Sequence, residues 1–149
     1  MAHEHAHDQH SLPSTSAHAT GHCLIGCVIG ETAGLMLGTI LGLGTALTIA
    51  LAVVLAYVAG MTLAVRPVMR KEGLSVGQAL RVVWLGEAIS IGVMEIVMNG
   101  VDYAIGGIQS GSILAPLFWV GLLASIPPAF LAAWPVNYWL LARELKTHH

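Results

Sequence analysis

Four stretches of the chain, each long and almost wholly apolar, restrict it to a membrane protein. They run from about Cys23 to Leu43, Thr45 to Val65, Val82 to Gly100 and Leu114 to Leu141. Crossing a hydrocarbon core of roughly 30 Å takes about 20 apolar residues, and in lipid only a helix satisfies the backbone of such a segment by itself. Only 9% of the residues are charged, against about 25% in soluble domains. The sequence therefore predicts an all-α, polytopic bundle of four transmembrane helices.

The basic residues all lie at the same end of this predicted bundle. Four of the six are in or beside the second connection and two follow the fourth helix: Arg66, Arg70, Lys71, Arg81, Arg143 and Lys146. Basic residues concentrate on the cytoplasmic side of a membrane. We therefore expect both termini in the cytoplasm and a multi-pass membrane protein.

The segment before the first helix is polar and rich in histidine. Residues 1–20 hold His3, His5, His7, His10 and His18 among small and polar residues. Such a segment has too few apolar side chains to fold alone, so we expect a flexible arm over 1–20, a transmembrane domain over 21–143 and a tail over 144–149. A His-rich tract can bind metal weakly; the alternative is a solvated tail without a function.

Soft metal ligands gather where the first helix enters the membrane. Cys23 and Cys27 are one helical turn apart, beside His22, and Met98 lies on the third helix. Thiolates and thioethers are soft donors suited to Cu(I), and imidazole also binds transition metals. The predicted metal ligands are His22, Cys23, Cys27, Glu31 and Met98. The alternatives are that the cysteines are small apolar residues in the core and that the methionine is simply packed.

Acidic residues inside the predicted spans indicate an ion pathway. A charged group at the bilayer centre costs at least about 2.5–3.5 kcal/mol, so it usually faces a partner or water. Glu31 and Glu87 are expected at similar depth, and a polar stripe at helical spacing continues outward on the third helix. The predicted pathway residues are Glu87, Glu95, Asn99, Asp102 and Asn137. A protonated, hydrogen-bonded structural pair of glutamates is the alternative.

The first helix also carries a ridge of glycines. Glycine recurs at every fourth residue from Gly26 to Gly38, a pattern that lets another helix approach closely.

Other sequence features argue against several function classes. There is no nucleophile with a base and acid, no set of histidines within the spans for haem and no basic patch for nucleic acid. We expect no enzyme activity, no organic cofactor and no nucleic-acid partner.

Three sequence blocks resemble one known family. "SAHATGHCLIGCVIGE" at 16–31, "MEIVMNGVD" at 94–102 and "AAWPVNYWL" at 132–140 are similar to a bacterial and archaeal family of four-helix integral-membrane proteins described as a domain of unknown function. The resemblance implies a small membrane protein, in some members with a copper-handling context, and no established activity.

Three functions are compatible with these features. The first is binding, and possibly transport, of a soft transition-metal ion such as Cu(I), in a homo-oligomer embedded in the lipid bilayer. The second is a proton or small-cation conduit that uses Glu31, Glu87 and Glu95. The third is a membrane subunit that transports nothing and serves a partner protein.

Overall fold

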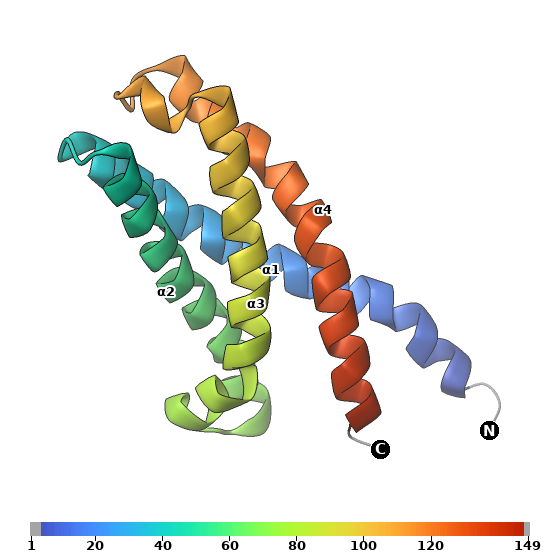
Figure 1. Cartoon of the computed structure of the whole chain (residues 1–149). Helices are drawn as coiled ribbons and strands as arrows, with labels where there is room; N and C mark the ends of the chain where they lie inside the picture. Colours follow the sequence, from blue (N-terminus) through green and yellow to red (C-terminus); the bar gives the residue numbers. More distant parts are fainter. Residues whose placement is uncertain (1–3, 148–149) are drawn as a thin grey trace.

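The computed structural model describes the backbone of residues 4–147 and the side chains of residues 12–143. The chain forms four long helices and one short 3₁₀ turn (Figure 1). In chain order they are α1 (Glu4–Ile40), α2 (Thr45–Glu72), α3 (Val76–Ile105), η1 (Ile108–Ser110) and α4 (Pro116–Thr147). The predicted all-α fold with four helices is confirmed, and the described residues contain no strand.

Helices α1 and α2 form an antiparallel hairpin that is held by the glycine ridge. A Cβ atom built on Gly26 would lie only 2.7 Å from the Cα of Gly60, and one on Gly30 would collide with the backbone at Ala56. The same holds for Gly34 against Ala52. Small residues at four-residue spacing on both helices therefore allow their backbones to touch, as the ridge predicts.

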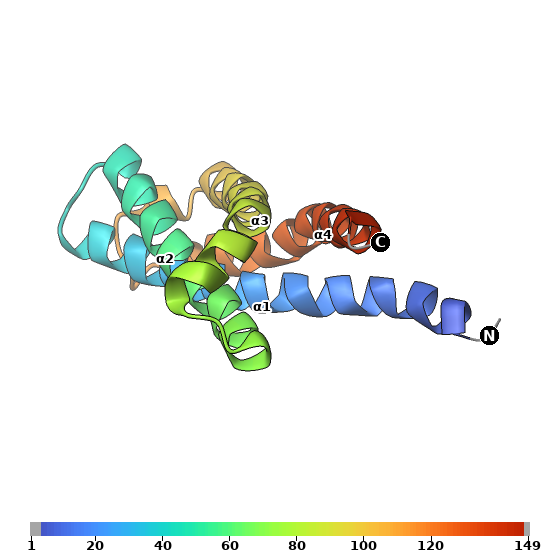
Figure 2. The ribbon, with the colours of Figure 1, turned by 90° about the horizontal axis from the view of Figure 1, so that it is seen from below.

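Helix α3 runs in the same direction as α1 and lies between α2 and α4 (Figures 1 and 2). It begins at Ser75, whose side chain accepts a hydrogen bond from the amide of Gln78, while the Gln78 side chain accepts one from the Ser75 amide. A serine followed three residues later by glutamine is the sequence pattern of such a capping box. Helix α3 ends at Gly106, which adopts a left-handed conformation with φ of 93°, a geometry that favours glycine.

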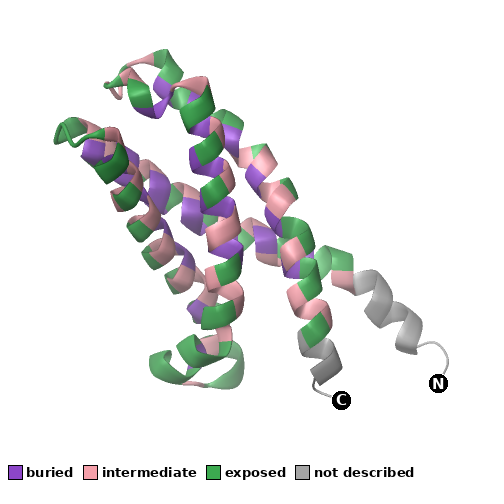
Figure 3. Cartoon of the chain, in the orientation of Figure 1, coloured by how far each residue is buried: buried purple, intermediate pink, exposed green. Residues whose placement is uncertain are grey.

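Three of the helices are long and apolar enough to cross a membrane: Leu12–Ile40 of α1, Thr45–Glu72 of α2 and Pro116–Arg143 of α4. The predicted third span is also helical, within the 30 residues of α3, but α3 is not one of these three. Its acidic side chains turn into the bundle: Glu95 and Asp102 are buried, while the apolar Ile96 between them is exposed. Figure 3 shows the same division, with buried residues on facing sides of the helices.

The predicted flexible arm over residues 1–20 differs from the structure, because α1 begins at Glu4 and continues without a break. Ser16 and Thr20 are fully buried. Their hydroxyls donate to the carbonyls of Pro13 and Ser16, at 2.9 and 2.7 Å, which is why polar residues continue the helix here. The side chains of His3, His5, His7 and His10 lie outside the described residues. The side chains of the predicted tail over 144–149 also lie outside them, although the backbone of α4 is described as far as Thr147.

Helix α4 holds this early part of α1 in place. Nε1 of Trp134 donates to the hydroxyl of Ser16 at 3.0 Å, and Nδ2 of Asn137 donates to the hydroxyl of Thr20 at 2.9 Å. Both bonds join residues more than a hundred positions apart in sequence. They explain why α1 packs on the bundle at Ser16 and Thr20 although the composition there is that of a solvated segment.

Candidate functional site

The two thiols lie inside the bundle, on the face of α1 that meets α3. Cys23 is 3% exposed and Cys27 is fully buried, and both are free cysteines. The hydroxyl of Ser90 donates to the sulfur of Cys23 at 3.8 Å, and the Cys27 thiol lies beside both Cys23 and Glu95. The thiols are thus adjacent, as their i, i+4 spacing predicts.

Glu31 is one turn beyond Cys27 on the same face. Its side chain is fully buried, and neither carboxyl oxygen has a hydrogen-bond partner among the described residues. The acids close enough to influence it are Glu95 and Asp102, both on α3. Glu31 therefore sits where the carboxyls of two helices converge.

Glu95 is 3% exposed and is held from its own helix. Nδ2 of Asn99, one turn along α3, donates to the Glu95 carbonyl at 2.9 Å and to its Oε2 at 3.2 Å. Within the described part of the chain, Oε1 of Glu95 and Oδ1 of Asn99 accept no hydrogen bond. Met94 and Met98 are fully buried and line the same face of α3.

Asp102 ends the series at the last turn of α3. It is fully buried, and no described residue donates a hydrogen bond of good geometry to either carboxyl oxygen. A Cβ atom on Gly107 or on Gly121 would collide with its Oδ1, so the carboxyl fills the space that these two glycines leave. Sequence reasoning missed both glycines. Gly107 belongs to the Gly106–Gly107 pair in the loop after α3, which was an available signal, whereas Gly121 lies within α4 and no local pattern marked it.

Together Cys27, Glu31, Glu95, Asn99 and Asp102 form a continuous set, here called the interior polar row. Five of its carboxyl oxygens are buried without a hydrogen bond to any described residue. Each unsatisfied buried polar atom costs about 1–3 kcal/mol, and the donors nearest to these carboxyls are the Cys27 thiol beside Glu95 and the Ile108 amide beside Asp102. A proton or a cation shared among the carboxyls would relieve this cost.

Other predicted site residues lie elsewhere. His22 is exposed whereas Cys23 is buried, because one residue along a helix turns the side chain by about 100°. Asn137 is buried against Thr20 rather than in the row. The predicted mouth of His22, Cys23 and Cys27 is therefore not assembled.

The sequence predicts that Glu87 lies at the depth of Glu31. In the structure the acids near Glu31 are instead Glu95 and Asp102. Cys23 on α1 contacts Ser90 on α3, and Glu31 lies about two turns beyond Cys23. Glu87 is half-buried and lies eight residues before Glu95, about 12 Å nearer the α2–α3 connection.

Metal ligation by the row as it stands has no support from geometry. Among the described side chains, no three or more histidine, cysteine, aspartate or glutamate residues are placed to hold one metal ion. Structural zinc sites use four protein ligands and catalytic ones three. The row is an arrangement of separate acids and thiols along a path.

Comparison with known proteins gives one result. A family model described as a domain of unknown function (DUF4396) matches residues 14–146, so the chain belongs to this family. No curated protein and no solved structure matches it.

Proposed function

We propose that this member of the DUF4396 family is a membrane protein that conducts protons, or another small cation, along the interior polar row. The observation that carries the proposal is the set of five buried carboxyl oxygens with no hydrogen-bond partner among the described residues. Ionisable groups inside membrane bundles characteristically belong to ion pathways and proton relays.

The order of the acids supports transfer from one to the next. Glu31 on α1 is near both Glu95 and Asp102, which are seven residues apart on α3, or about 10.5 Å along the axis. Glu31 thus bridges two carboxyls that are too far apart to exchange a proton directly. Its loss should interrupt the row at its centre.

The outer end of the row meets a pocket between the α1–α2 turn and η1. Its volume is about 230 Å³, and its lining includes Thr39, Thr48 and Ile108. Ile108 also lies beside the carboxyl of Asp102. Ile108 therefore adjoins both Asp102, through its backbone, and this pocket, which we propose as the outer entry of the pathway.

The proposal is tested in proteoliposomes that contain a pH-sensitive dye and are energised by a potassium diffusion potential. Wild-type protein should acidify the lumen, whereas Glu31→Gln should reduce the flux to the level of empty vesicles. Glu72→Gln, the same change at an exposed position at the end of α2, should conduct like the wild type. Full flux in Glu31→Gln would overturn the proposal.

A second candidate, handling of a soft metal ion such as Cu(I), is favoured by one observation. The thiols of Cys23 and Cys27 are adjacent, reduced and buried, and soft thiolates select Cu(I). Purified protein should then bind Cu(I), and Cys23→Ser with Cys27→Ser should abolish binding. Proton flux that survives this double change assigns conduction to the acids and metal binding to the thiols.

The orientation and assembly are part of the proposal. The basic residues lie at the end of the bundle where α2 joins α3 and where α4 ends (Figure 1), so the positive-inside rule puts both termini in the cytoplasm of a prokaryote. Four helices enclose little space, and we propose a homo-oligomer. Wild-type vesicles that carry no flux, together with a stable co-purifying partner protein, would favour a subunit that does not transport.

A further inference from the structure

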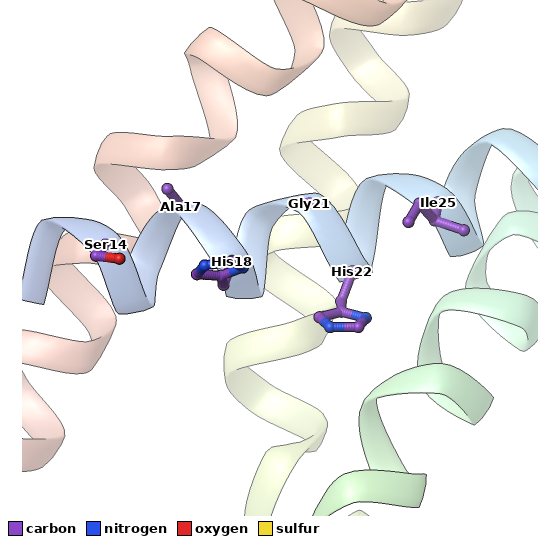
Figure 4. Close-up of a pocket in the computed structure, with 6 residues that line it drawn as sticks. All are labelled: Ser14, Ala17, His18, Gly21, His22 and Ile25. Atoms are coloured by element: carbon purple, nitrogen blue, oxygen red, sulfur yellow. The ribbon is translucent and has the colours of Figure 1, made fainter. Parts of the chain in front are cut away.

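The outward face of α1 carries a pair of histidines that the proposed pathway does not use. His18 and His22 line a shallow pocket of about 340 Å³ together with Ser14, Ala17, Gly21 and Ile25 (Figure 4). Both histidines are exposed. All six residues belong to α1, so the pocket is a feature of one helix face.

The spacing of the two imidazoles suits chelation of a single ion. Residues four apart on a helix have Cβ atoms about 5–6 Å apart on the same face. Two histidines at this i, i+4 spacing bind zinc in one well-known helical motif. Figure 4 shows the His18 ring over the α1 ribbon and the His22 ring beside the ribbon one turn further along.

The surroundings leave room for an ion and its water ligands. Ala17 and Gly21 are small, and a Cβ atom on Gly21 would meet nothing within 4 Å. The pocket contains no lysine or arginine that would repel a cation. Two imidazoles supply two ligands to a transition-metal ion, and water can fill its remaining positions.

The two imidazoles are accessible from outside the bundle. Both histidines are exposed, and the exposed residues on this face of α1 continue with Ile25 and Ile29, which are 55% and 57% exposed.

We propose that His18 and His22 form a surface site for a divalent transition-metal ion of the imidazole-preferring class, Zn²⁺, Ni²⁺ or Cu²⁺. The site is separate from the buried thiols: Cys23 follows His22 in sequence, but its side chain is turned by about 100° around α1 and is buried. It is also independent of the interior polar row, so its failure would leave the proposed conduction untouched.

Ni²⁺ binding to full-length protein tests the site. The parent variant replaces His3, His5, His7, His10, His148 and His149 by alanine, which removes the other histidines of the chain except the pair. This parent should bind one Ni²⁺ per chain, measured by calorimetry. His18→Ala and His22→Ala should each weaken binding by at least about tenfold, because the second ligand of a chelate acts at high effective concentration.

A matched control keeps the number of histidines constant. Combining His22→Ala with Ile25→His moves the second imidazole to i, i+7, about 10.5 Å along the axis, where one ion cannot bridge the pair. Binding as weak as that of His22→Ala alone supports chelation. Binding as tight as in the parent, or an unchanged affinity in His18→Ala, would overturn the proposal.

Discussion

Replacement of Gly30 by alanine should destabilise the bundle by forcing α1 and α2 apart. The added methyl group would collide with backbone atoms of Leu55 and Ala56, which cannot move without the whole of α2. Overpacking of this kind costs about 1–3 kcal/mol, and contact with backbone puts it at the upper end. The better helix propensity of alanine returns roughly 1 kcal/mol. The net loss in the free energy of unfolding is therefore about 2 kcal/mol.

Thermal unfolding in detergent, followed by tryptophan fluorescence, measures this loss. At about 2–4 °C per kcal/mol, Gly30→Ala should lower the Tm by about 4–8 °C. Gly21→Ala is the control: it makes the same change on the same helix, where the new Cβ meets nothing within 4 Å, and its Tm should equal or slightly exceed that of the wild type. Equal melting of the two variants would refute close packing along the glycine ridge.

Three further predictions concern a buried hydrogen bond, the space around Asp102 and the orientation in the membrane. Thr20→Val should lower the Tm, because it leaves the buried amide of Asn137 without its acceptor, a loss of about 1–3 kcal/mol. Gly121→Ala should lower both the Tm and the proton flux, since its Cβ would collide with Asp102, whereas Gly100→Ala, with open space around it, should change neither. A reporter enzyme that is active only outside the cytoplasm, fused after the last residue, should remain inactive, and strong activity would contradict the proposed orientation.

Helix positions could be predicted from the sequence because each depends on local pattern. Apolar length gives the helices, Ser75 and Gln78 give the start of α3, and the glycine repeat gives the α1–α2 contact. The beginning of α1 could not be predicted in this way. Ser16 and Thr20 are helical because of partners on α4, more than a hundred residues away.

The interior polar row could be predicted only in part, for a similar reason. Helical spacing correctly gathers the thiols on one face of α1 and Glu95 with Asn99 on α3. The relative depth of α1 and α3 depends on the contact between Cys23 and Ser90, which no local pattern encodes. Glu31 lies near Glu95 and Asp102 as a result. Counting depth from the helix ends predicts instead that its neighbour is Glu87.

The current carried by wild-type protein in a planar bilayer tests the central claim most directly. With equal salt on both sides and a tenfold difference in proton concentration, a proton-selective pathway reverses at about 59 mV, the equilibrium potential for a monovalent ion. Conduction along the interior polar row predicts a reversal potential near this value, and loss of the current in Glu31→Gln. A reversal potential of zero, or a current that Glu31→Gln leaves intact, would contradict it.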